Sequence, residues 1–396
     1  GKTWVTATII RAIRASEGSA RIAVCAPTGK AAVRATESLA KQKVSIVATT
    51  IHRLLGGMPG DGADGDGWVW EFDADNPLPF DFLFVDEASM CDTTLLAALL
   101  AAVPTGCHVL LIGDPDQLSP VGHGAPLRDL LVAGVPAGRL TEIYRNAGRI
   151  VRECARIRDH QKIQFADQLD LPAGENLILW KCKTPDEQIA RLEDFFRRTK
   201  ASTRFNATWD IQVVVPVNDK SPLARLKLNP MLQGWLNPRG ESAPGCPFRV
   251  DDKIVCTKNG ELPLVAGDSN GAKTVGTARL ANGEQARVLE VQPSLMLIEL
   301  QSPDRLVRVP RGKARVENEG DGPAAGCDFE LAYAISVHKS QGSEWPIVLV
   351  MLDGYGGALR VMDRHWLYTA ISRASVATIC IGSQSTADRI VAQSHM

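Results

Sequence analysis

Apolar residues in the first part of the chain follow two alternating patterns. Val5, Ile9, Ile10 and Ile13 have the spacing of one helix face, and Gly18 supplies a stop signal. Uninterrupted apolar runs follow at residues 21–26, 82–85 and 108–112. Such runs are typical of strands that are buried on both faces of a parallel sheet. The alternation of the two patterns predicts an α/β fold.

A polar cluster follows each of these apolar runs. The clusters are Pro27-Thr28-Gly29-Lys30, Asp86-Glu87-Ala88-Ser89 and Gly113-Asp114-Pro115-Asp116-Gln117. The carboxyl ends of parallel strands lie at one edge of the sheet, and ligands bind at that edge. We therefore expect the three clusters to converge on one site.

The first three residues, Gly1-Lys2-Thr3, match the end of the phosphate-binding motif G-x-x-x-x-G-K-[ST]. In this motif backbone amides hold the phosphates of a nucleotide, the lysine reaches the β- and γ-phosphates, and the hydroxyl binds Mg²⁺. The tripeptide is common by chance, but the predicted helix and strands after it support the motif. We expect these three residues to bind ATP, with Thr3 and Asp86 holding Mg²⁺. We also expect the glycine-rich front half of the motif to be missing.

Asp86, Glu87 and Gln117 have the chemistry that nucleotide hydrolysis needs. Asp86 can hold Mg²⁺ indirectly, and Glu87 can orient and deprotonate the attacking water. The Gln117 amide can contact both the γ-phosphate and that water. Acidic residues also favour the start of a helix, so the Asp86-Glu87 pair alone fits a solvated helix start equally well. Lys2 before the pair and Gln117 after it favour an active site.

Taken in order, the motifs of this chain resemble those of superfamily 1 helicases of the RecD-like type. The matching segments are residues 1–3, 26–32, 50–55, 85–90, 113–118, 140–145, 337–345 and 368–374. The ordered set spans nearly the whole chain and is far more specific than any one of its pieces. The family also carries a full phosphate loop, an adenine-contacting stretch and usually an amino-terminal domain, none of which stands in this sequence.

The resemblance implies an ATP-driven motor that moves 5′ to 3′ along single-stranded DNA and unwinds tailed duplex DNA. It implies that Arg145 and Arg373, the latter on an apparent helix, act as arginine fingers across a cleft between two motor domains. A guanidinium at that place neutralises charge that develops in the transition state. The alternative is that each arginine pairs with a surface carboxylate. Gly342 and Glu344 would lie near the nucleotide, with Glu344 on the ribose.

Several candidate contacts to the nucleic-acid strand lie at apparent helix starts or in motifs that touch the strand in relatives. They are Pro27, Thr28, Lys30, Thr50, His52, Ser336 and His338. Amides, hydroxyls and an ammonium at a helix start suit a backbone phosphate. A lone histidine is more often a structural residue, so both histidines keep that alternative. Trp345 either stacks on a base or packs in the protein, and we expect packing.

The motifs and the local composition divide the chain into parts. We expect a first RecA-like domain at 1–145 with a hairpin insertion at 56–80, a second RecA-like domain at 146–252 and 329–396, and an inserted small β-barrel at 253–328. The last of these is implied by the resemblance and by strand-like runs at 286–291, 295–300 and 306–309. The expected fold class is thus α/β, with two parallel-sheet motor domains, a small barrel and a hairpin.

The hairpin insertion begins with residues 56–67, which are too rich in glycine for a packed element. Trp68-Val69-Trp70-Glu71-Phe72 follows and alternates aromatic residues with others, as a strand would. In the resembled family a hairpin at this place is the pin that separates the two DNA strands. An edge hairpin that packs its aromatic side chains on the core explains the pattern equally well.

The composition limits the class of protein but does not identify any reactive residues. The 396 residues are 45% hydrophobic and 22% charged, which is typical of a soluble globular chain with more than one domain. The nine cysteines include no C-x-x-C pair, so we expect no zinc site and a reducing cytoplasm as the location. No membrane span or signal peptide is visible. A net charge of −1 is not that of a nucleic-acid coat, but a motor can confine positive charge to one groove.

Two rival functions remain open. A nucleotide-regulated DNA-binding subunit of a nuclease, repair or defence complex would carry the same motifs with little unwinding. A catalytically inactive fragment would result from an incomplete phosphate loop. Translocation measured directly separates the helicase from the regulated subunit, and the residues before Gly1 decide about the fragment. The preference for DNA over RNA rests on the resemblance alone, because contacts to the 2′-hydroxyl have no readable motif.

Overall fold

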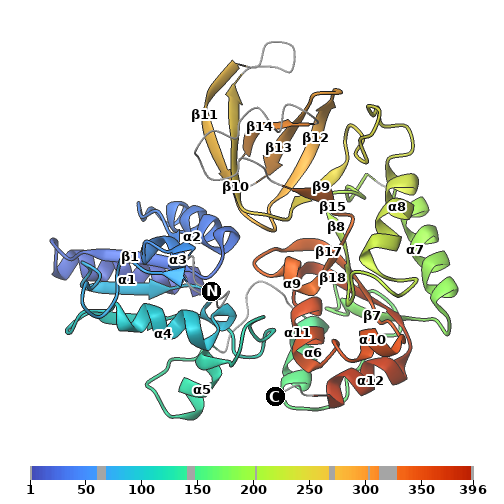
Figure 1. Cartoon of the computed structure of the whole chain (residues 1–396). Coiled ribbons are helices and arrows are strands. Elements are labelled where there is room, and N and C mark those ends of the chain that lie inside the picture. The colour runs from blue at the N-terminus through green and yellow to red at the C-terminus, as the bar shows by residue number, and fades with distance from the viewer. Residues whose placement is uncertain are drawn as a thin grey trace. The chain divides into compact units, whose positions relative to one another are not determined.

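The structure is a computed structural model, and Figure 1 shows its elements. It describes residues 2–59, 68–140, 148–200, 203–266, 273–301, 304–311 and 328–393. The chain divides into two units, Gly1–Ile143 and Tyr144–Met396. Each unit contains a parallel sheet with helices. The first unit also contains a two-stranded antiparallel pair, and the second unit a larger antiparallel sheet.

The sheet of the first unit has the strand order β2-β1-β5-β6, and all of its pairs are parallel. Its strands are β2 (Thr49–Thr50), β1 (Ile22–Ala26), β5 (Phe82–Val85) and β6 (His108–Leu111). The three apolar runs of the sequence are thus β1, β5 and β6. The expected parallel α/β fold is confirmed, because strands buried on both faces need uninterrupted apolar sequences.

Helices cover both faces of this sheet (Figure 1). The helices are α1 (Lys2–Ser16), α2 (Gly29–Lys41), α3 (Ile51–Leu54), α4 (Thr93–Ala101), α5 (Pro126–Val132) and the short 3₁₀ helix η1 (Ala88–Met90). Val24 and Ala26 of β1 pack in one core with α1 and α2, whereas Ala23 and Cys25 pack in another with α4. Successive side chains of a strand point to opposite faces, so one strand supplies both cores.

The hairpin insertion is a short antiparallel pair of β3 (Met58–Pro59) and β4 (Trp68–Val69). The expected strand over Trp68–Phe72 is wrong in its length, because β4 ends at Val69. The backbone N–H groups of Glu71 and Phe72 donate to the Leu55 carbonyl instead, at 2.9 and 3.1 Å. Trp70 and Phe72 then pack against the core around Leu55. Hydrogen bonds to the carbonyl of Leu55, just after α3, therefore take the place of further pairing between β3 and β4.

The parallel sheet of the second unit has the order β16-β8-β17-β18-β7. Its strands are β16 (Ala334–Ser336), β8 (Ile211–Val215), β17 (Trp345–Met351), β18 (Ala374–Gly382) and β7 (Leu177–Lys181). The sequence pointed to an α/β unit here but not to β7, an edge strand that pairs with β18. A short apolar run without a motif carries little signal of its own.

Helices α7 and α8 run side by side and pack on one face of this sheet, as Figure 1 shows. Helix α11 contacts β17, α6 and α12. The helices of the unit are α6 (Arg149–Arg158), α7 (Pro185–Thr199), α8 (Arg225–Leu236), α9 (Val337–Ser340), α10 (Gly356–Leu359), α11 (Arg364–Ile371) and α12 (Gln384–Ala392). Within the described residues, none of the helices has the length and hydropathy that a membrane span requires.

The antiparallel sheet of the second unit has the order β11-β10-β14-β13-β12-β9-β15. Its strands are β9 (Lys253–Cys256), β10 (Gly260–Ala266), β11 (Lys273–Leu280), β12 (Gln285–Val291), β13 (Leu295–Gln301), β14 (Asp304–Pro310) and β15 (Phe329–Leu331). The strand-like runs read from the sequence are β12, β13 and β14. Pairing of β11 with β15 is not seen among the described residues, so closure into a barrel stays a prediction.

Candidate functional site

The polar clusters of the first unit meet at one edge of its sheet. Cys25 pairs with Val85 and Val85 with Leu111, so β1, β5 and β6 end at the same level. Asp86 N–H donates to the Cys25 carbonyl at 2.8 Å, and Ala88 N–H donates to the Ile112 carbonyl at 2.8 Å. These bonds join the residues after one strand to the end of its neighbour. The predicted convergence of the clusters at the strand ends is therefore present in the backbone.

Lys2 and Glu87 lie close together in this edge region. Lys2 begins α1, and its Nζ lies 3.7 Å from Oε2 of Glu87. Both side chains are partly exposed, at 33% and 19%. An exposed pair of this kind adds little stability. The ion pair matters for its geometry, because it places Lys2 of the phosphate motif beside Glu87, the proposed base. Thr3 follows Lys2 in α1 and is partly buried, and Gly1 lies outside the described residues.

Glu87 has an unusual backbone conformation for a residue with a side chain. Its φ is 50° and its ψ is 39°, in the left-handed region. That conformation costs a non-glycine residue on the order of 1–2 kcal/mol. Glu87 precedes η1 but makes no capping hydrogen bond with its side chain, so the acidic pair is not explained as a helix cap. Strain of this kind is concentrated at functional sites.

The environment of Asp86 disfavours its ionised form. Burial raises the pKa of Asp86, and the neighbouring Glu87 carboxylate raises it further. Lys2 and a 3.0 Å hydrogen bond from the Glu87 N–H to Asp86 Oδ1 act in the opposite direction. Two adjacent carboxylates with one lysine leave a negative charge that a bound cation would stabilise. Mg²⁺ fits this set, because it usually takes one or two carboxylates and completes its shell with phosphate oxygens and water.

Gln117 is held in a turn that follows β6. Its Nε2 donates to Oδ2 of Asp114 at 3.2 Å, and its N–H donates to the Asp114 carbonyl at 3.2 Å. Asp114 also accepts from the N–H of Asp116 at 3.1 Å. Asp114 therefore positions Gln117. Sequence reasoning did not assign that role, although an aspartate that begins a turn is the available signal.

Ser89 and Gly113 mark how tightly the ends of β5 and β6 pack. A Cβ on Gly113 would lie 2.9 Å from the N–H nitrogen of Ser89 and 2.5 Å from a methyl of Leu127, so only glycine fits. The Ser89 hydroxyl is buried and has no hydrogen-bond partner within the described part of the chain. Ser89 and Gln117 line the same small hollow. Sequence reasoning quoted Ser89 in a motif without giving it a role.

Two of the residues proposed to contact the nucleic acid cap helices that begin at the ends of neighbouring β-strands. Thr28 caps α2 by accepting from Ala31 N–H, and Thr50 caps α3 by accepting from Arg53 N–H, each at 3.2 Å. Ala26 pairs with Thr50, so the two helix starts are neighbours. A capping hydroxyl accepts one bond and keeps its own O–H to donate to a phosphate. Pro27 precedes Thr28, and Lys30 lies in the first turn of α2.

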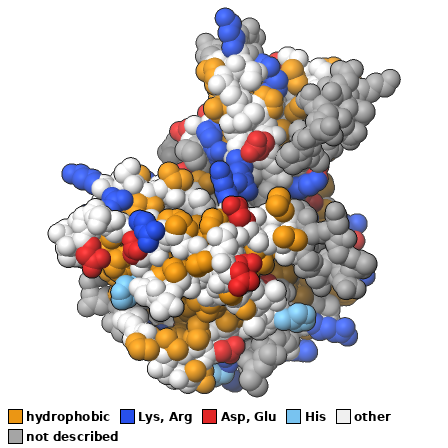
Figure 2. All heavy atoms as spheres, turned by 60° about the vertical axis from the view of Figure 1, so that its left-hand side comes forward, with side chains coloured by type: hydrophobic (Ala, Val, Ile, Leu, Met, Phe, Trp, Pro, Cys, Tyr) orange, Lys and Arg blue, Asp and Glu red, His pale blue; other side chains and the backbone are white. Residues whose placement is uncertain are grey.

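The proposed nucleic-acid contacts are marked by the helix caps at Thr28 and Thr50 and not by a uniformly basic surface. On the face that Figure 2 shows, basic and acidic side chains are interspersed, with apolar side chains between them. This matches the formal net charge of −1. Contacts to a nucleic-acid backbone would therefore rest on local groups.

His52 lies in α3 beneath two tryptophans of the hairpin region. Its ring centroid lies 4.6 Å from that of Trp68 and 5.6 Å from that of Trp70, and the two indoles stack at 5.7 Å. Burial lowers the pKa of His52, so the ring is neutral at physiological pH. Trp68 is 45% exposed. The cluster thus presents one aromatic surface next to the Thr50 cap.

In the second unit, a residue proposed to contact the nucleic acid also caps a helix, as in the first unit. Ser336 ends β16 and caps α9, with its Oγ accepting from Lys339 N–H at 3.4 Å. His338 is exposed on α9. Gly342 has a φ of 68°, a conformation that favours glycine. Glu344 comes directly before β17 and is partly buried. Trp345 is 5% exposed, so the expectation that it packs is confirmed.

Arg373 is not on a helix, as the sequence had indicated, but in the turn between α11 and β18. The helix ends at Ile371, and the Ser372 N–H closes its last turn. Arg373 is 6% exposed, and its Nε donates to the Thr369 carbonyl at 3.1 Å. The guanidinium is therefore held against the end of α11. Arg145 lies outside the described residues.

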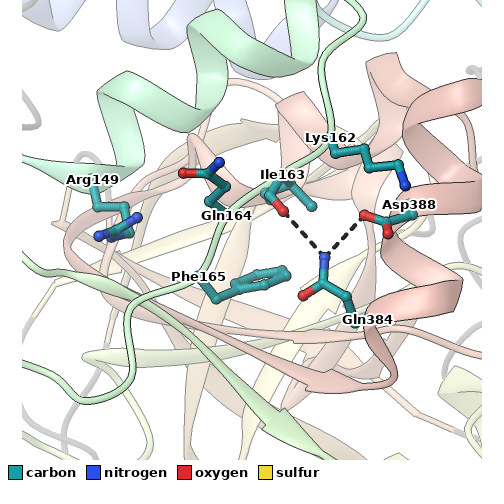
Figure 3. A pocket seen from close by; sticks show the side chains of 7 residues that line it. All are labelled: Arg149, Lys162, Ile163, Gln164, Phe165, Gln384 and Asp388. Carbon is teal, nitrogen blue, oxygen red and sulfur yellow. Dashed lines mark hydrogen bonds between the residues drawn. The ribbon is translucent and has the colours of Figure 1, made fainter.

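A pocket of the second unit has none of the predicted site residues in its lining (Figure 3). Its lining residues are Arg149, Lys162, Ile163, Gln164, Phe165, Gln384 and Asp388. The Gln384 amide donates to the Ile163 carbonyl at 3.1 Å and to Asp388 at 2.9 Å, as the dashed lines show. Arg149 is bound to Glu175. The Gln384 amide thus joins the segment at Ile163 to helix α12 across the pocket.

The first unit has the features of a phosphate-loop nucleotide hydrolase: a parallel sheet whose strand ends bring together a lysine, an acidic pair and a glutamine. Family models agree with this class. An AAA domain matches residues 1–171, and a UvrD-like helicase C-terminal domain matches residues 331–378.

Two curated relatives match most of this chain. The ATP-dependent RecD2 DNA helicase of Deinococcus radiodurans is 32% identical over 92% of this chain and 43% of its own length. The RecBCD enzyme subunit RecD of Mycobacterium tuberculosis is 28% identical over 99% of this chain and 67% of its own length. This chain is therefore homologous to these RecD2 and RecD proteins over most of its length. It spans less than half of the length of the RecD2 relative.

A solved structure shares the fold. Bacteroides Pif1, crystallised bound to single-stranded DNA, superposes with a TM-score of 0.50 at 16% identity, over 96% of this chain and 87% of that one. At this level of identity the likeness concerns the fold alone.

Proposed function

We propose that this protein is an ATP-driven helicase that moves 5′ to 3′ along single-stranded DNA and separates duplex DNA. The observation that carries the proposal is the meeting of Lys2 with Glu87, 3.7 Å apart, at a sheet edge that also bears Asp86. The relative named as an ATP-dependent DNA helicase supports it.

The residues of this edge have separate roles in hydrolysis. Gly1, Lys2 and Thr3 bind the phosphates of ATP, and Glu87 orients and deprotonates the attacking water. Gln117, held by Asp114, contacts the γ-phosphate and that water. Thr3 and Asp86 would hold Mg²⁺, whose charge would be available to neutralise that of the phosphate oxygens.

Further roles in hydrolysis are proposed for residues of the second unit. Arg373 neutralises charge on the transferred phosphoryl group, a role that is worth on the order of 10³–10⁵ in rate for arginine fingers. Arg145 has the same proposed role. Gly342 and Glu344 are proposed to contact the nucleotide, with Glu344 on the ribose. The support is their order in the family motifs.

The proposed contacts to single-stranded DNA are the helix caps and their neighbours. Thr28, Thr50 and Ser336 each keep a hydroxyl proton that can be donated to a phosphate. The further proposed contacts are Pro27, Lys30, His52 and His338. A partner complex is a separate proposal, supported by the relative named as a subunit of the RecBCD enzyme.

The direction of movement gives the test of the proposed function. We expect the full-length protein to unwind a duplex with a 5′ single-stranded tail and to leave a duplex with only a 3′ tail intact. Strand separation followed by gel or by fluorescence with the two substrates at equal concentration measures this. Unwinding of only the 3′-tailed substrate contradicts the proposed direction, and ATP hydrolysis with no unwinding of either favours the nucleotide-regulated subunit.

Trp68 is the residue through which the hairpin is proposed to act as a pin. Trp70 and Phe72 pack against the core, whereas Trp68 is 45% exposed and stacks on Trp70. Base stacking on an aromatic ring is worth about 1 to 3 kcal/mol per base. We therefore expect Trp68→Ala to lower the unwinding rate by about five- to 150-fold, with ATP hydrolysis on single-stranded DNA unchanged.

Val69 provides the matched control for this experiment, because it is the adjacent strand residue and is 56% exposed. We expect Val69→Ala to unwind like the unsubstituted protein. A full unwinding rate in Trp68→Ala would place strand separation elsewhere. Equal losses of unwinding and hydrolysis, with a lower melting temperature, would make Trp68 part of the core.

A further inference from the structure

Lys253 is a buried cation that the proposed mechanism does not use. It begins β9 and is 0% exposed. A fully buried lysine is rare in proteins, because a charge removed from water needs compensation. Lys253 pairs with Arg287 of β12, and its carbonyl accepts from Ala332 N–H at 2.8 Å. It therefore belongs to the backbone of the antiparallel sheet, while its side chain leaves that sheet.

The side chain of Lys253 ends between two tryptophans outside the antiparallel sheet. Its Nζ lies 5.5 Å from the ring centroid of Trp209 and 5.7 Å from that of Trp345. The same Nζ donates to the Thr208 carbonyl at 3.0 Å. Indole faces attract a desolvated cation. Burial lowers the pKa of Lys253 to about 7, and the Asp210 carboxylate acts against that shift.

Both tryptophans belong to parts that meet the parallel sheet. Trp209 lies in the turn before β8, and the carbonyl of its neighbour Asp210 accepts from Ile347 N–H of β17 at 2.9 Å. Trp345 is the first residue of β17. Lys253 thus contacts residues at the amino-terminal ends of β8 and β17, which are neighbouring strands of the parallel sheet.

Trp345 is bonded directly to the turn that carries Arg373. Its N–H donates to the Arg373 carbonyl at 3.0 Å, and it pairs with Ala374 of β18. The Arg373 guanidinium is held from the other side by the Thr369 carbonyl. A continuous set of contacts therefore runs from Lys253 through Trp345 to Arg373.

We propose that Lys253 is a positioning residue that holds Trp345, and through it the Arg373 turn, in place against the antiparallel sheet. The proposal rests on the proposed role of Arg373 in ATP hydrolysis. A packing residue alone would not need a cation: an apolar side chain of the same length would fill the space without the cost of burying a charge. When protonated, the ammonium attracts the faces of both indole rings, and the hydrogen bond to the Thr208 carbonyl holds the side chain between them in either protonation state.

Lys253→Met tests this role, since methionine keeps much of the length of the side chain and removes the charge. In the full-length protein we expect kcat for ATP hydrolysis stimulated by single-stranded DNA to fall about tenfold, with KM for ATP changed less than about twofold. In an Arg373→Ala background we expect Lys253→Met to cause no further loss, because two residues that act through one contact are not additive.

Ile254→Ala is the matched control, because Ile254 is the next residue of β9 and is buried in the core of the antiparallel sheet. We expect Ile254→Ala to lower stability without changing kcat at a temperature where it remains folded. Equal losses of kcat in Lys253→Met and Ile254→Ala would make Lys253 a structural residue and overturn the proposal. A further loss in the Arg373→Ala background would also overturn it.

Hydrogen exchange provides a readout that does not depend on catalysis. The Trp345 N–H donates to the Arg373 carbonyl, so its exchange reports the contact itself. We expect it to exchange faster in Lys253→Met than in Ile254→Ala. Unchanged exchange overturns the positioning role. Absence of ATP hydrolysis in the unsubstituted protein, with faster exchange in Lys253→Met, would refute the proposed function and leave the positioning of Trp345 standing.

Discussion

Glu87→Gln is expected to abolish ATP hydrolysis stimulated by single-stranded DNA while the full-length protein still binds ATP. A general base contributes about 10²–10⁴ in rate, and an amide cannot accept the proton of the attacking water. Binding survives because Lys2, which lies 3.7 Å from Glu87, remains available to the phosphates. Steady-state hydrolysis and calorimetric titration with ATP measure the two effects separately.

Glu17→Gln is the control for this substitution, since Glu17 is an exposed acidic residue just after α1. We expect it to hydrolyse ATP at the unsubstituted rate. Full turnover by Glu87→Gln would remove Glu87 from the role of base. Loss of ATP binding together with hydrolysis would instead mean that the Lys2–Glu87 contact organises the phosphate site.

The second large effect concerns the pH dependence of stability. The pKa of Lys253 is about 7 in the folded chain, against an ordinary value of 10.5. Between these two values the unfolded chain binds more protons, so the free energy of unfolding rises with pH in this window. Lowering the pH from about 10.5 to 7 is therefore expected to cost at most about 5 kcal/mol, and further acidification nothing more from this group.

Lys253→Met should remove this dependence. The measurement is the difference in free energy of unfolding between Lys253→Met and the unsubstituted protein at pH 7 and pH 10, from denaturant curves of the second unit's transition. Methionine should make the protein relatively more stable at pH 7, where folding must either bury the lysine charge or remove its proton. Lys227→Met, at an exposed lysine of α8, is the control. Equal differences at both pH values would show that Lys253 is not destabilised by burial.

The sequence by itself determined the first parallel sheet and the edge where its polar residues meet. The runs that became β1, β5 and β6 are apolar without interruption, because both faces of that sheet are covered by helices. Parallel strands bring the residues after their carboxyl ends together whatever their separation along the chain. Asp86, Glu87 and Gln117 could therefore be assigned to one edge from spacing alone.

Local sequence was a weaker guide where a competing bond decided the conformation. The alternation over Trp68–Phe72 predicts a longer strand than the one that forms, because the Leu55 carbonyl accepts from two of its N–H groups. Arg373 continues a helical pattern, but the helix ends at Ile371 and the chain turns into β18. In both cases the deciding partner lies outside the pattern itself.

Only the tertiary structure showed which charged and aromatic side chains are buried together. A lysine at the start of a strand is ordinarily solvated, and nothing around Lys253 in the sequence marks it as buried. Its burial depends on Trp209 and Trp345, which come from distant parts of the chain and meet it only when the two sheets of the second unit pack. Periodicity and motifs encode contacts along the chain and across one sheet. The compensation of a buried charge depends on three-dimensional neighbours, so the fold alone decided it.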